Sequence, residues 1–196
     1  MNLESGEPKL VQCGLVHYQF ETIHPFGDGN GRVGRLLIVL QLIQLELLSA
    51  PLIYPSVYFE RNRDEYYELL QNVRERGMWD EWLEFFVRGI KEQCQETLKF
   101  TERILQLREE LMQAIGNVRR RASLSAVLGA FFFGPTLSIQ EIQDRANISS
   151  FHTVRTALED LEQLGMVYEI TGRRRGRVYA CMPVLDTIFG LEDQSQ

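Results

Sequence analysis

The 196-residue chain contains only three cysteines and six prolines. Cys13, Cys94 and Cys181 lie far apart and form no CxxC pair, so they predict neither a disulfide framework nor a metal site. The most apolar segment, Leu36 to Leu48, is interrupted by polar residues, and no N-terminal stretch has the pattern of a secretory signal. These absences exclude a disulfide-rich secreted scaffold and a transmembrane helix. We expect a reduced, cytoplasmic protein without a membrane partner.

The composition is that of a folded globular protein, but its charge is distributed unevenly. Hydrophobic residues make up 44% of the chain and charged residues 24%, and the formal net charge is −6. That charge makes the whole chain a poor nonspecific binder of nucleic acid. The net charge is −6 over residues 1–117, +3 over residues 118–182 and −3 over the tail from residue 183. The changes of sign predict two domains, 1–117 and 118–196, the second ending in a short acidic tail.

Apolar residues in the first part recur at the spacing of helices. After an irregular start over residues 1–12, we predict helices over residues 14–23, 32–48, 61–76, 80–94 and 98–115. His24-Pro25 ends the first helix, because a residue before proline disfavours helical angles. A glycine-rich loop precedes the second helix, and residues 51–55 connect it to the third. Apart from these connections, the first part is predicted to be all helix.

The second part has a different pattern. It predicts helices over residues 124–133, 138–146 and 151–164, followed by strands over residues 166–170 and 178–182. Ser138 and Glu141 have the spacing of a capping box at the start of the middle helix. The arginine-rich segment TGRRRGR joins the two strands as a hairpin. Three helices followed by a two-stranded wing is the order of a winged helix-turn-helix.

The loop segment HPFGDGNGRVGR, residues 24–35, concentrates the candidate chemistry of the chain. Gly27, Gly29 and Gly31 lie within five residues, directly before a predicted helix. Such a sequence leaves backbone N–H groups at the positive end of a helix, with no side chains to obstruct a ligand. We therefore predict that this loop, including Asn30, binds a phosphate chain.

The same segment carries ionisable side chains that suit a phosphate ligand. Arg32 and Arg35 are three residues apart, so they face the same side of the helix and can hold further phosphate oxygens. Asp28 offers the hard oxygen ligand that Mg²⁺ takes, and His24 suits a general base. Singly, each residue is better explained by a turn or a structural role; together they favour a functional site. Phe26 is expected to be a core anchor that fixes the loop.

At every defining position this segment resembles the HPFx(D/E)GNGRxxR signature of the Fic family (filamentation induced by cAMP). The flanking segments HYQFETIHPF and YFERNRDEYYELLQ are also similar to Fic proteins with a C-terminal winged helix. The resemblance implies a mainly α fold, a Fic-type helical bundle followed by a small α+β winged helix-turn-helix domain. It implies a protein adenylyltransferase that moves AMP from ATP to a Tyr, Thr or Ser hydroxyl of a target protein. The chain itself is one candidate target, and a homodimer is one candidate assembly.

The same resemblance assigns roles to residues. His24 would be the general base and Asp28 the Mg²⁺ ligand, while residues 29–31 would form an anion hole for the α and β phosphates and Arg32 and Arg35 would clamp the β and γ phosphates. Candidates for the nucleoside pocket are Glu60, Asn62, Tyr66 and Tyr67. Alternatively, the two tyrosines serve only in packing, and Glu60 and Asn62 lie at a solvated helix start. His17 is expected to be a buried, hydrogen-bonded helix residue.

Two elements of the family pattern are missing from this sequence. Only 23 residues precede His24, so the β-hairpin flap that pins a target segment is expected to be absent. No Glu is followed by Gly or Asn, so the inhibitory (S/T)xxxE(G/N) motif is absent too. We expect either a truncated version of a larger protein or inhibition in trans.

The predicted winged helix suggests a second kind of partner. Candidate DNA contacts at the start of its third helix and at the wing tip are Ser150, Thr153, Arg155, Arg173, Arg174 and Arg175. Pairing with a protein is the alternative for such a domain. Two rival functions therefore stand beside the enzyme: a DNA-binding regulator whose Fic part senses a nucleotide, and a non-catalytic Fic fragment.

Overall fold

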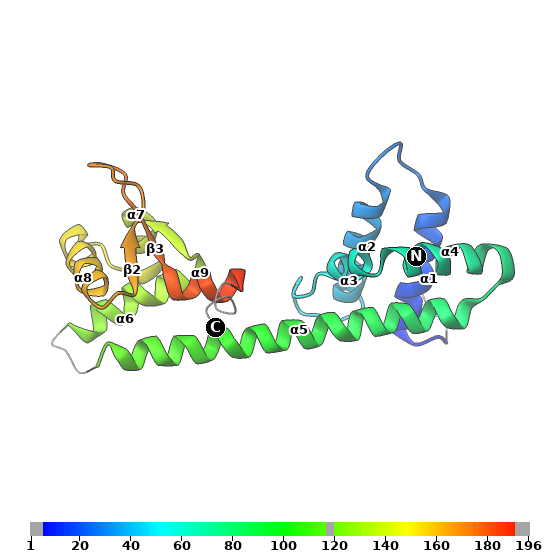
Figure 1. The fold of residues 1–196 in the computed structure, drawn as a ribbon, viewed down its shortest axis with the longest axis horizontal. Helices are drawn as coiled ribbons and strands as arrows, with labels where there is room; N and C mark the ends of the chain where they lie inside the picture. The colour runs from blue at the N-terminus through cyan, green and yellow to red at the C-terminus, as the bar shows by residue number, and fades with distance from the viewer. Residues whose placement is uncertain (1–5, 117–119, 191–196) are drawn as a thin grey trace. The chain divides into compact units, whose positions relative to one another are not determined.

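The computed structural model describes residues 6–116 and 120–190 (Figure 1). Contacts divide the chain into two compact units, Met1–Lys99 and Phe100–Gln196. The domain boundary predicted between residues 117 and 118 falls within residues 117–119, which lie outside the described ranges. The end of the predicted acidic tail, residues 191–196, lies outside them as well. As predicted, the described chain is mainly helical and carries one small sheet.

Helix α5 (Trp79–Ala114) runs without interruption where two helices were expected, over residues 80–94 and 98–115. The intervening residues 95–97 are Gln, Glu and Thr. None of them is Gly or Pro, so none interrupts the backbone hydrogen bonds of the helix. The prediction of a break is wrong because these residues interrupt the regular spacing of apolar residues but are still compatible with a helix.

The N-terminal unit also contains helices α1 (Lys9–Ile23), α2 (Asn30–Gln44), α3 (Pro55–Arg61) and α4 (Arg63–Arg76). α1 begins within the segment predicted to be irregular, and α2 lies against it, joined by a loop at one end (Figure 1). α3 was not predicted, because its first residue Pro55 looks like the end of a connector. Proline is in fact favoured at the first position of a helix, where its missing N–H costs nothing.

Aromatic side chains form the core of the N-terminal unit. Trp82, Phe85 and Phe86 on α5 are buried together with Phe59 on α3. The Trp82 indole Nε1–H donates to the carbonyl of Gly14 on α1, 3.1 Å away, so the buried indole keeps a polar partner. This cluster fixes α1 against α5 and thereby sets the position of the loop that follows α1.

The C-terminal unit combines short helices with a three-stranded antiparallel sheet. After α6 (Arg121–Ala130) and the 3-10 turn η1 (Phe131–Phe133), the order is β1 (Thr136–Ser138), α7 (Ile139–Ala146), α8 (Phe151–Gln163), β2 (Val167–Glu169), β3 (Val178–Cys181) and α9 (Met182–Phe189). The strand order is β1-β3-β2, with Thr136 opposite Ala180 and Val167 opposite Cys181. β1 and α9 were not predicted, because β1 is too short to show alternation and α9 begins directly at the end of a strand.

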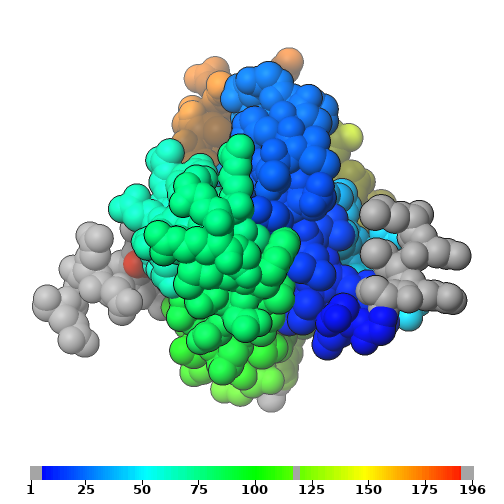
Figure 2. Space-filling view, turned by 90° about the vertical axis from the view of Figure 1, so that its right-hand side faces the viewer, coloured from blue at the N-terminus to red at the C-terminus, as the bar shows by residue number. Residues whose placement is uncertain are grey.

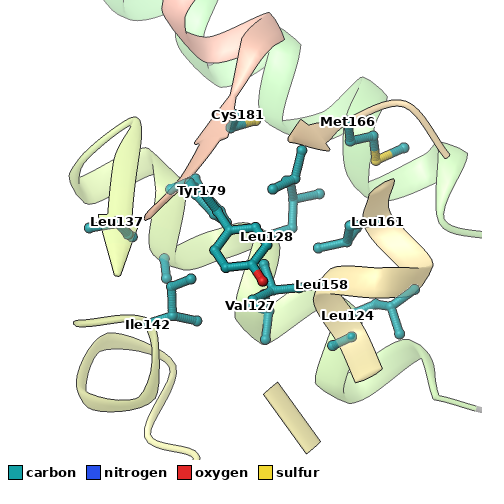
Figure 3. Packing of buried hydrophobic residues seen from close by; sticks show 14 of the residues in the cluster. Leu124, Val127, Leu128, Leu137, Ile142, Leu158, Leu161, Met166, Tyr179 and Cys181 are labelled. Atoms are coloured by element: carbon teal, nitrogen blue, oxygen red, sulfur yellow. The ribbon is translucent and has the colours of Figure 1, made fainter. Parts of the chain in front are cut away.

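Apolar residues from every layer of this unit meet in one core. Leu128 on α6, Leu158 on α8 and Ile142 on α7 are fully buried, and their side chains converge below β3 with that of Tyr179 (Figure 3). The predicted capping box is confirmed: the Ser138 hydroxyl accepts from the Glu141 N–H, and the Glu141 carboxylate accepts from the Ser138 N–H. The cap and the core together fix where α7 begins.

In residues 6–116 and 120–190, no helix is both long enough and apolar enough to span a bilayer.

Candidate functional site

The glycine-rich loop lies between two residues in left-handed conformation. α1 ends at Ile23, and His24 follows at φ 50° and ψ 58°, its N–H donating to the carbonyl of Phe20, 3.0 Å away. Gly29, which precedes α2, has φ 83°, a value that side-chain-bearing residues rarely adopt. The two left-handed residues reverse the chain and place the loop at the open end of the α1–α2 pair, exposed on the surface shown in blue at the top of Figure 2.

Asn30 closes this loop. Its side chain is buried, and its Oδ1 accepts from the Phe26 N–H at 2.9 Å while its Nδ2–H donates to the Phe26 carbonyl at 2.6 Å. Phe26 itself is 51% exposed, so the expectation that its ring anchors the loop in the core is wrong. Because the Asn30 amide binds the loop, only its backbone N–H is available to a phosphate. No pattern in the sequence indicates this role of the Asn30 side chain.

The two predicted phosphate clamps lie over the glycine backbone at the start of α2. A Cβ atom at Gly31 would lie 3.0 Å from Nη1 of Arg35, and one at Gly29 would lie 3.4 Å from Nη2 of Arg32. The first-turn N–H groups of a helix have no acceptor within the helix. The structure therefore brings together unpaired backbone donors and two guanidinium groups, a combination that binds polyanions.

Asp28 lies at the outer edge of the same loop. Its Oδ1 accepts from the Gly29 N–H at 2.7 Å, and its Oδ2 is 3.6 Å from Nη2 of Arg32. Both side chains are largely exposed, so this ion pair adds little stability and can open for a ligand. Arg35 is held differently, because its Nε–H donates to the Ser56 hydroxyl on α3, 3.2 Å away. Within the part of the chain that the structure describes, no group of three or more His, Cys, Asp or Glu side chains is placed to hold a metal ion.

His24 is exposed at the entrance of the loop. Its Nδ1 is 3.4 Å from the Glu21 carbonyl, a long contact that favours the tautomer with the proton on Nδ1. In that tautomer Nε2 carries the lone pair and can accept a proton. This is the state that a general base requires.

His17 is buried beneath the loop, as predicted. Its Nδ1–H donates to the Gly34 carbonyl on α2 at 3.2 Å, and its Nε2 accepts from the Tyr66 hydroxyl on α4 at 2.9 Å. Its ring stacks on Phe59 and Trp82, with centroids 5.7 Å and 6.0 Å away. Burial lowers the pKa of His17 to about 4, so the ring is neutral at physiological pH. His17 thus joins three helices and is not a second catalytic base.

Glu21 is an acidic residue of this region that sequence reasoning missed. Its Oε1 is buried and has no hydrogen-bond partner among the described residues, and burial raises the pKa of its carboxyl group. A Cβ atom at Gly34 would overlap this carboxylate, so the glycine makes room for it between α1 and α2. The only sequence signal is a glycine inside an otherwise apolar helix.

The four nucleoside candidates lie in different environments. Glu60 is exposed and 3.8 Å from Arg63, and the Asn62 amide donates to the Tyr58 carbonyl at 2.9 Å, where α3 meets α4. Tyr66 is in the core, its hydroxyl donating to His17. Tyr67 is 52% exposed, with the Arg63 guanidinium 5.7 Å from its ring centroid. Of the two tyrosines, only Tyr67 presents an accessible ring.

The candidate DNA contacts also lie in different environments. Ser150 caps α8, because its hydroxyl accepts from the Thr153 N–H at 3.3 Å. Arg155 donates to Glu159 on the next turn at 2.9 Å. Arg174 and Arg175 line a cavity of about 400 Å³ together with Arg155, whereas Arg173 is not among the residues that line it.

The segment that contains the loop is similar to known proteins. Residues 1–42 match the sequence profile of the Fic/DOC family. A probable protein adenylyltransferase of Aquifex aeolicus is 41% identical over 61 residues, which are 31% of this chain and 17% of the relative. The protein adenylyltransferase Fic of Aedes aegypti is 35% identical over 87 residues, which are 44% of this chain and 15% of that protein.

A solved structure is similar as well. It is that of a Fic family protein from Desulfovibrio desulfuricans G20, with a TM-score of 0.48, 22% sequence identity, and coverage of 91% of this chain and 50% of that one. The matched segments cover less than a fifth of the two curated relatives. The similarity to the Fic/DOC family lies in the first 42 residues, which include the whole glycine-rich loop.

Proposed function

We propose that this chain is a protein adenylyltransferase, which transfers AMP from ATP to the hydroxyl group of a Tyr, Thr or Ser side chain in a target protein. The observation that carries the proposal is the open loop, where backbone donors and the guanidinium groups of Arg32 and Arg35 surround the start of α2 and His24 stands at the entrance. The names of the relatives that share this segment support it. The three cysteines are free thiols, which fits a reducing cytoplasm, where ATP is available.

In the proposed reaction, the phosphate chain of ATP lies on residues 29–31, with Arg32 and Arg35 on the β and γ phosphates. Nε2 of His24 accepts the proton of the target hydroxyl, whose oxygen forms a bond to the α-phosphorus. The bond from that phosphorus to the bridging oxygen of the β phosphate breaks, and pyrophosphate leaves. The protein holds the reacting groups in position and compensates the negative charge of the phosphates, and these two effects account for most of the catalysis in phosphate transfer.

Asp28 fits one ligand position of Mg²⁺, since its carboxylate is exposed and shares the loop with the phosphate donors. A single carboxylate suffices where phosphate oxygens and water supply the other ligands. Bound there, Mg²⁺ would neutralise charge on the phosphates.

For the nucleoside, we propose contacts from Tyr67, Glu60 and Asn62, which lie at or near the accessible surface of α3 and α4. Tyr66 acts indirectly, since its hydroxyl orients His17, which in turn binds the backbone of α2 at Gly34. In our proposal Tyr66 therefore supports the site from the core and does not line the nucleoside pocket.

The deciding experiment incubates the chain with α-labelled ATP and Mg²⁺, alone and with cell lysate, and measures label on protein. We expect His24→Ala to lower transfer by about 10² to 10⁴-fold, the usual contribution of a positioned base, and to leave ATP affinity unchanged by calorimetry. His152→Ala is the matched control, an exposed histidine in the other unit. Transfer by His24→Ala at the wild-type rate would refute the assignment of the base. ATP binding without transfer by the wild type would favour a nucleotide sensor or a non-catalytic fragment.

We propose a second function for the C-terminal unit, binding of duplex DNA as a winged helix. The arrangement of α6, α7 and α8 before the β2–β3 hairpin supports it, together with the cavity that Arg155, Arg174 and Arg175 line. The net charge of +3 over residues 118–182, against −6 over the residues before them, favours the same part of the chain. Its test is retention of a duplex at low salt by the full chain.

A further inference from the structure

The two predicted phosphate clamps are held by partners of different charge. Nη2 of Arg32 lies 3.6 Å from the Asp28 carboxylate, whereas the Arg35 Nε–H donates to the neutral hydroxyl of Ser56 on α3, 3.2 Å away. Among the described residues, no carboxylate lies within ion-pair distance of Arg35. Arg35 is therefore held by a partner that leaves its charge uncompensated.

The hydrogen bond to Ser56 uses only one N–H donor of the Arg35 guanidinium. It involves Nε, so Nη1 and Nη2 keep their donors for a ligand. Both nitrogens lie over the first turn of α2, because a Cβ atom at Gly31 would be 3.0 Å from Nη1 and 3.8 Å from Nη2. The Ser56 hydroxyl thus holds Arg35 in an orientation that adds a pair of free donors to the backbone N–H groups of the loop. Such a pair can bind two oxygens of one phosphate group.

Helix α3 gives the Ser56 hydroxyl a fixed position. Ser56 is exposed, but Tyr58 and Phe59, which follow it closely, are buried in the aromatic core. The Tyr58 hydroxyl accepts from the Arg88 Nε–H on α5 at 3.0 Å, and the Phe59 ring stacks on His17 of α1. Because these contacts join α3 to two other helices, the position of the hydroxyl does not depend on the conformation of the glycine-rich loop.

A competing acceptor for Arg35 lies on α1. Oε1 of Glu21 is buried beside Gly34 and has no hydrogen-bond partner among the described residues. Burial raises the pKa of this carboxyl group, and the positive charge of Arg35 acts in the opposite direction, so the two groups are close enough to attract each other. An arginine released from Ser56 would be drawn to this carboxylate, and part of its charge would then be lost to a phosphate ligand.

We propose that Ser56 is a positioning residue for Arg35, and that this pair gives the site its preference for nucleotides with β and γ phosphates over nucleoside monophosphates. The inference rests on the proposed adenylyl transfer, in which Arg35 binds these phosphates. Glu60, a proposed nucleoside contact, lies in the same helix as Ser56. Helix α3 therefore connects the part of the site that binds the nucleoside with the residue that orients the phosphate clamp.

The test measures the affinity of the full chain for ATP and for AMP by calorimetry in the presence of Mg²⁺. In Ser56→Ala we expect the Kd for ATP to rise about 3 to 10-fold, the usual contribution of one hydrogen bond. The Kd for AMP should stay unchanged, because AMP lacks the phosphates that Arg35 binds. In an Arg35→Ala background, Ser56→Ala should lower ATP affinity no further, since the hydroxyl acts through that arginine. Ser56→Thr keeps the hydroxyl and should bind ATP as the wild type does.

Ser49→Ala is the matched control, because it removes an exposed hydroxyl of the same unit outside α3. An equal loss of ATP and AMP affinity in Ser56→Ala would indicate a displaced helix and overturn the positioning role. ATP affinity at the wild-type level in Ser56→Ala, or a further loss in the Arg35→Ala background, would also overturn it. In those cases label transfer that depends on His24 would leave the proposed function standing. A wild type that binds no ATP would overturn the inference and the proposed function together.

Discussion

The buried histidine under the loop, His17, should make the unfolding free energy of the N-terminal unit depend on pH. His17 is neutral in the folded unit, with its pKa lowered to about 4, whereas an exposed histidine titrates near 6.5. The unfolded chain therefore binds a proton at a higher pH than the folded chain does. Stability from this residue is present above about pH 6.5 and is lost as the pH falls toward 4, below which both states carry the proton.

The magnitude follows from the two pKa values. Their difference corresponds to about 3 kcal/mol of unfolding free energy, of which about 2.5 kcal/mol is lost between pH 7 and 4.5. The loss arises because burial among aromatic rings penalises the charged form of the His17 ring, and the charge on Arg35 adds to this penalty. That is a large part of the stability of a small unit.

The assay is urea unfolding followed by tryptophan fluorescence at pH 7 and pH 4.5. The only two tryptophans of the chain, Trp79 and Trp82, belong to the N-terminal unit, so the signal reports on that unit. The control is His17→Gln, which shares every other titrating group with the wild type but cannot titrate at this position. The stability difference between the two proteins should shrink by about 2.5 kcal/mol at pH 4.5. A difference that does not change with pH would refute the argument that His17 is buried and neutral.

Three further predictions concern packing, the loop and the hairpin. Gly89→Ala should destabilise the N-terminal unit by about 1 to 2 kcal/mol in urea unfolding, because its Cβ would lie 2.6 Å from Cε1 of the buried Tyr58. Asn30→Ala should lower ATP affinity in calorimetry, and cost about 1 to 3 kcal/mol of stability, because the backbone groups of Phe26 lose their partners. Glu169→Gln should make the hairpin arginines faster sites of trypsin cleavage, because the ordered loop loses a charged acceptor.

Each of these has a matched control. Gly129→Ala should be neutral or stabilising, because its Cβ would meet only Cε of Met112 at 3.9 Å. Asn30→Asp keeps the acceptor for the Phe26 N–H and should retain part of the affinity. Glu159→Gln should leave hairpin cleavage unchanged. A Gly89→Ala variant as stable as wild type, unchanged ATP affinity in Asn30→Ala, or equal cleavage in Glu169→Gln would each contradict the corresponding contact.

The sequence predicted those parts of the molecule that depend on near neighbours. The loop of residues 24–35, the capping box at Ser138 and the ends of α1 and α4 follow from local spacing and turn chemistry. Predictions failed where the structure depends on contacts between residues far apart in the sequence, or where the local sequence is compatible with two structures. Phe26 looks like a core residue, and only the packing of α1 and α2 shows that its ring is half exposed.

The same limit applies to the candidate site. Glu21 and Tyr66 acquire their importance from residues on other helices, at Gly34 and His17, and no spacing along the chain reveals such pairs. The cavity at the hairpin likewise brings Phe151 and Arg155 together with residues about twenty positions later. For residues 29–35, by contrast, the glycine pattern alone indicated both the backbone donors and the arginines.

Most hydrogen bonds that shape the glycine-rich loop join residues that are close in the sequence. Those of His24, Gly29 and Asn30 join residues no more than four positions apart, whereas Gly34 and Arg35, on the first turns of α2, are held by His17 on α1 and Ser56 on α3. Such a loop is nearly self-contained, so it tolerates wide variation in the polypeptide around it. This gives a physical reason why proteins of very different length can share one short segment: the loop can keep its conformation when the polypeptide around it changes.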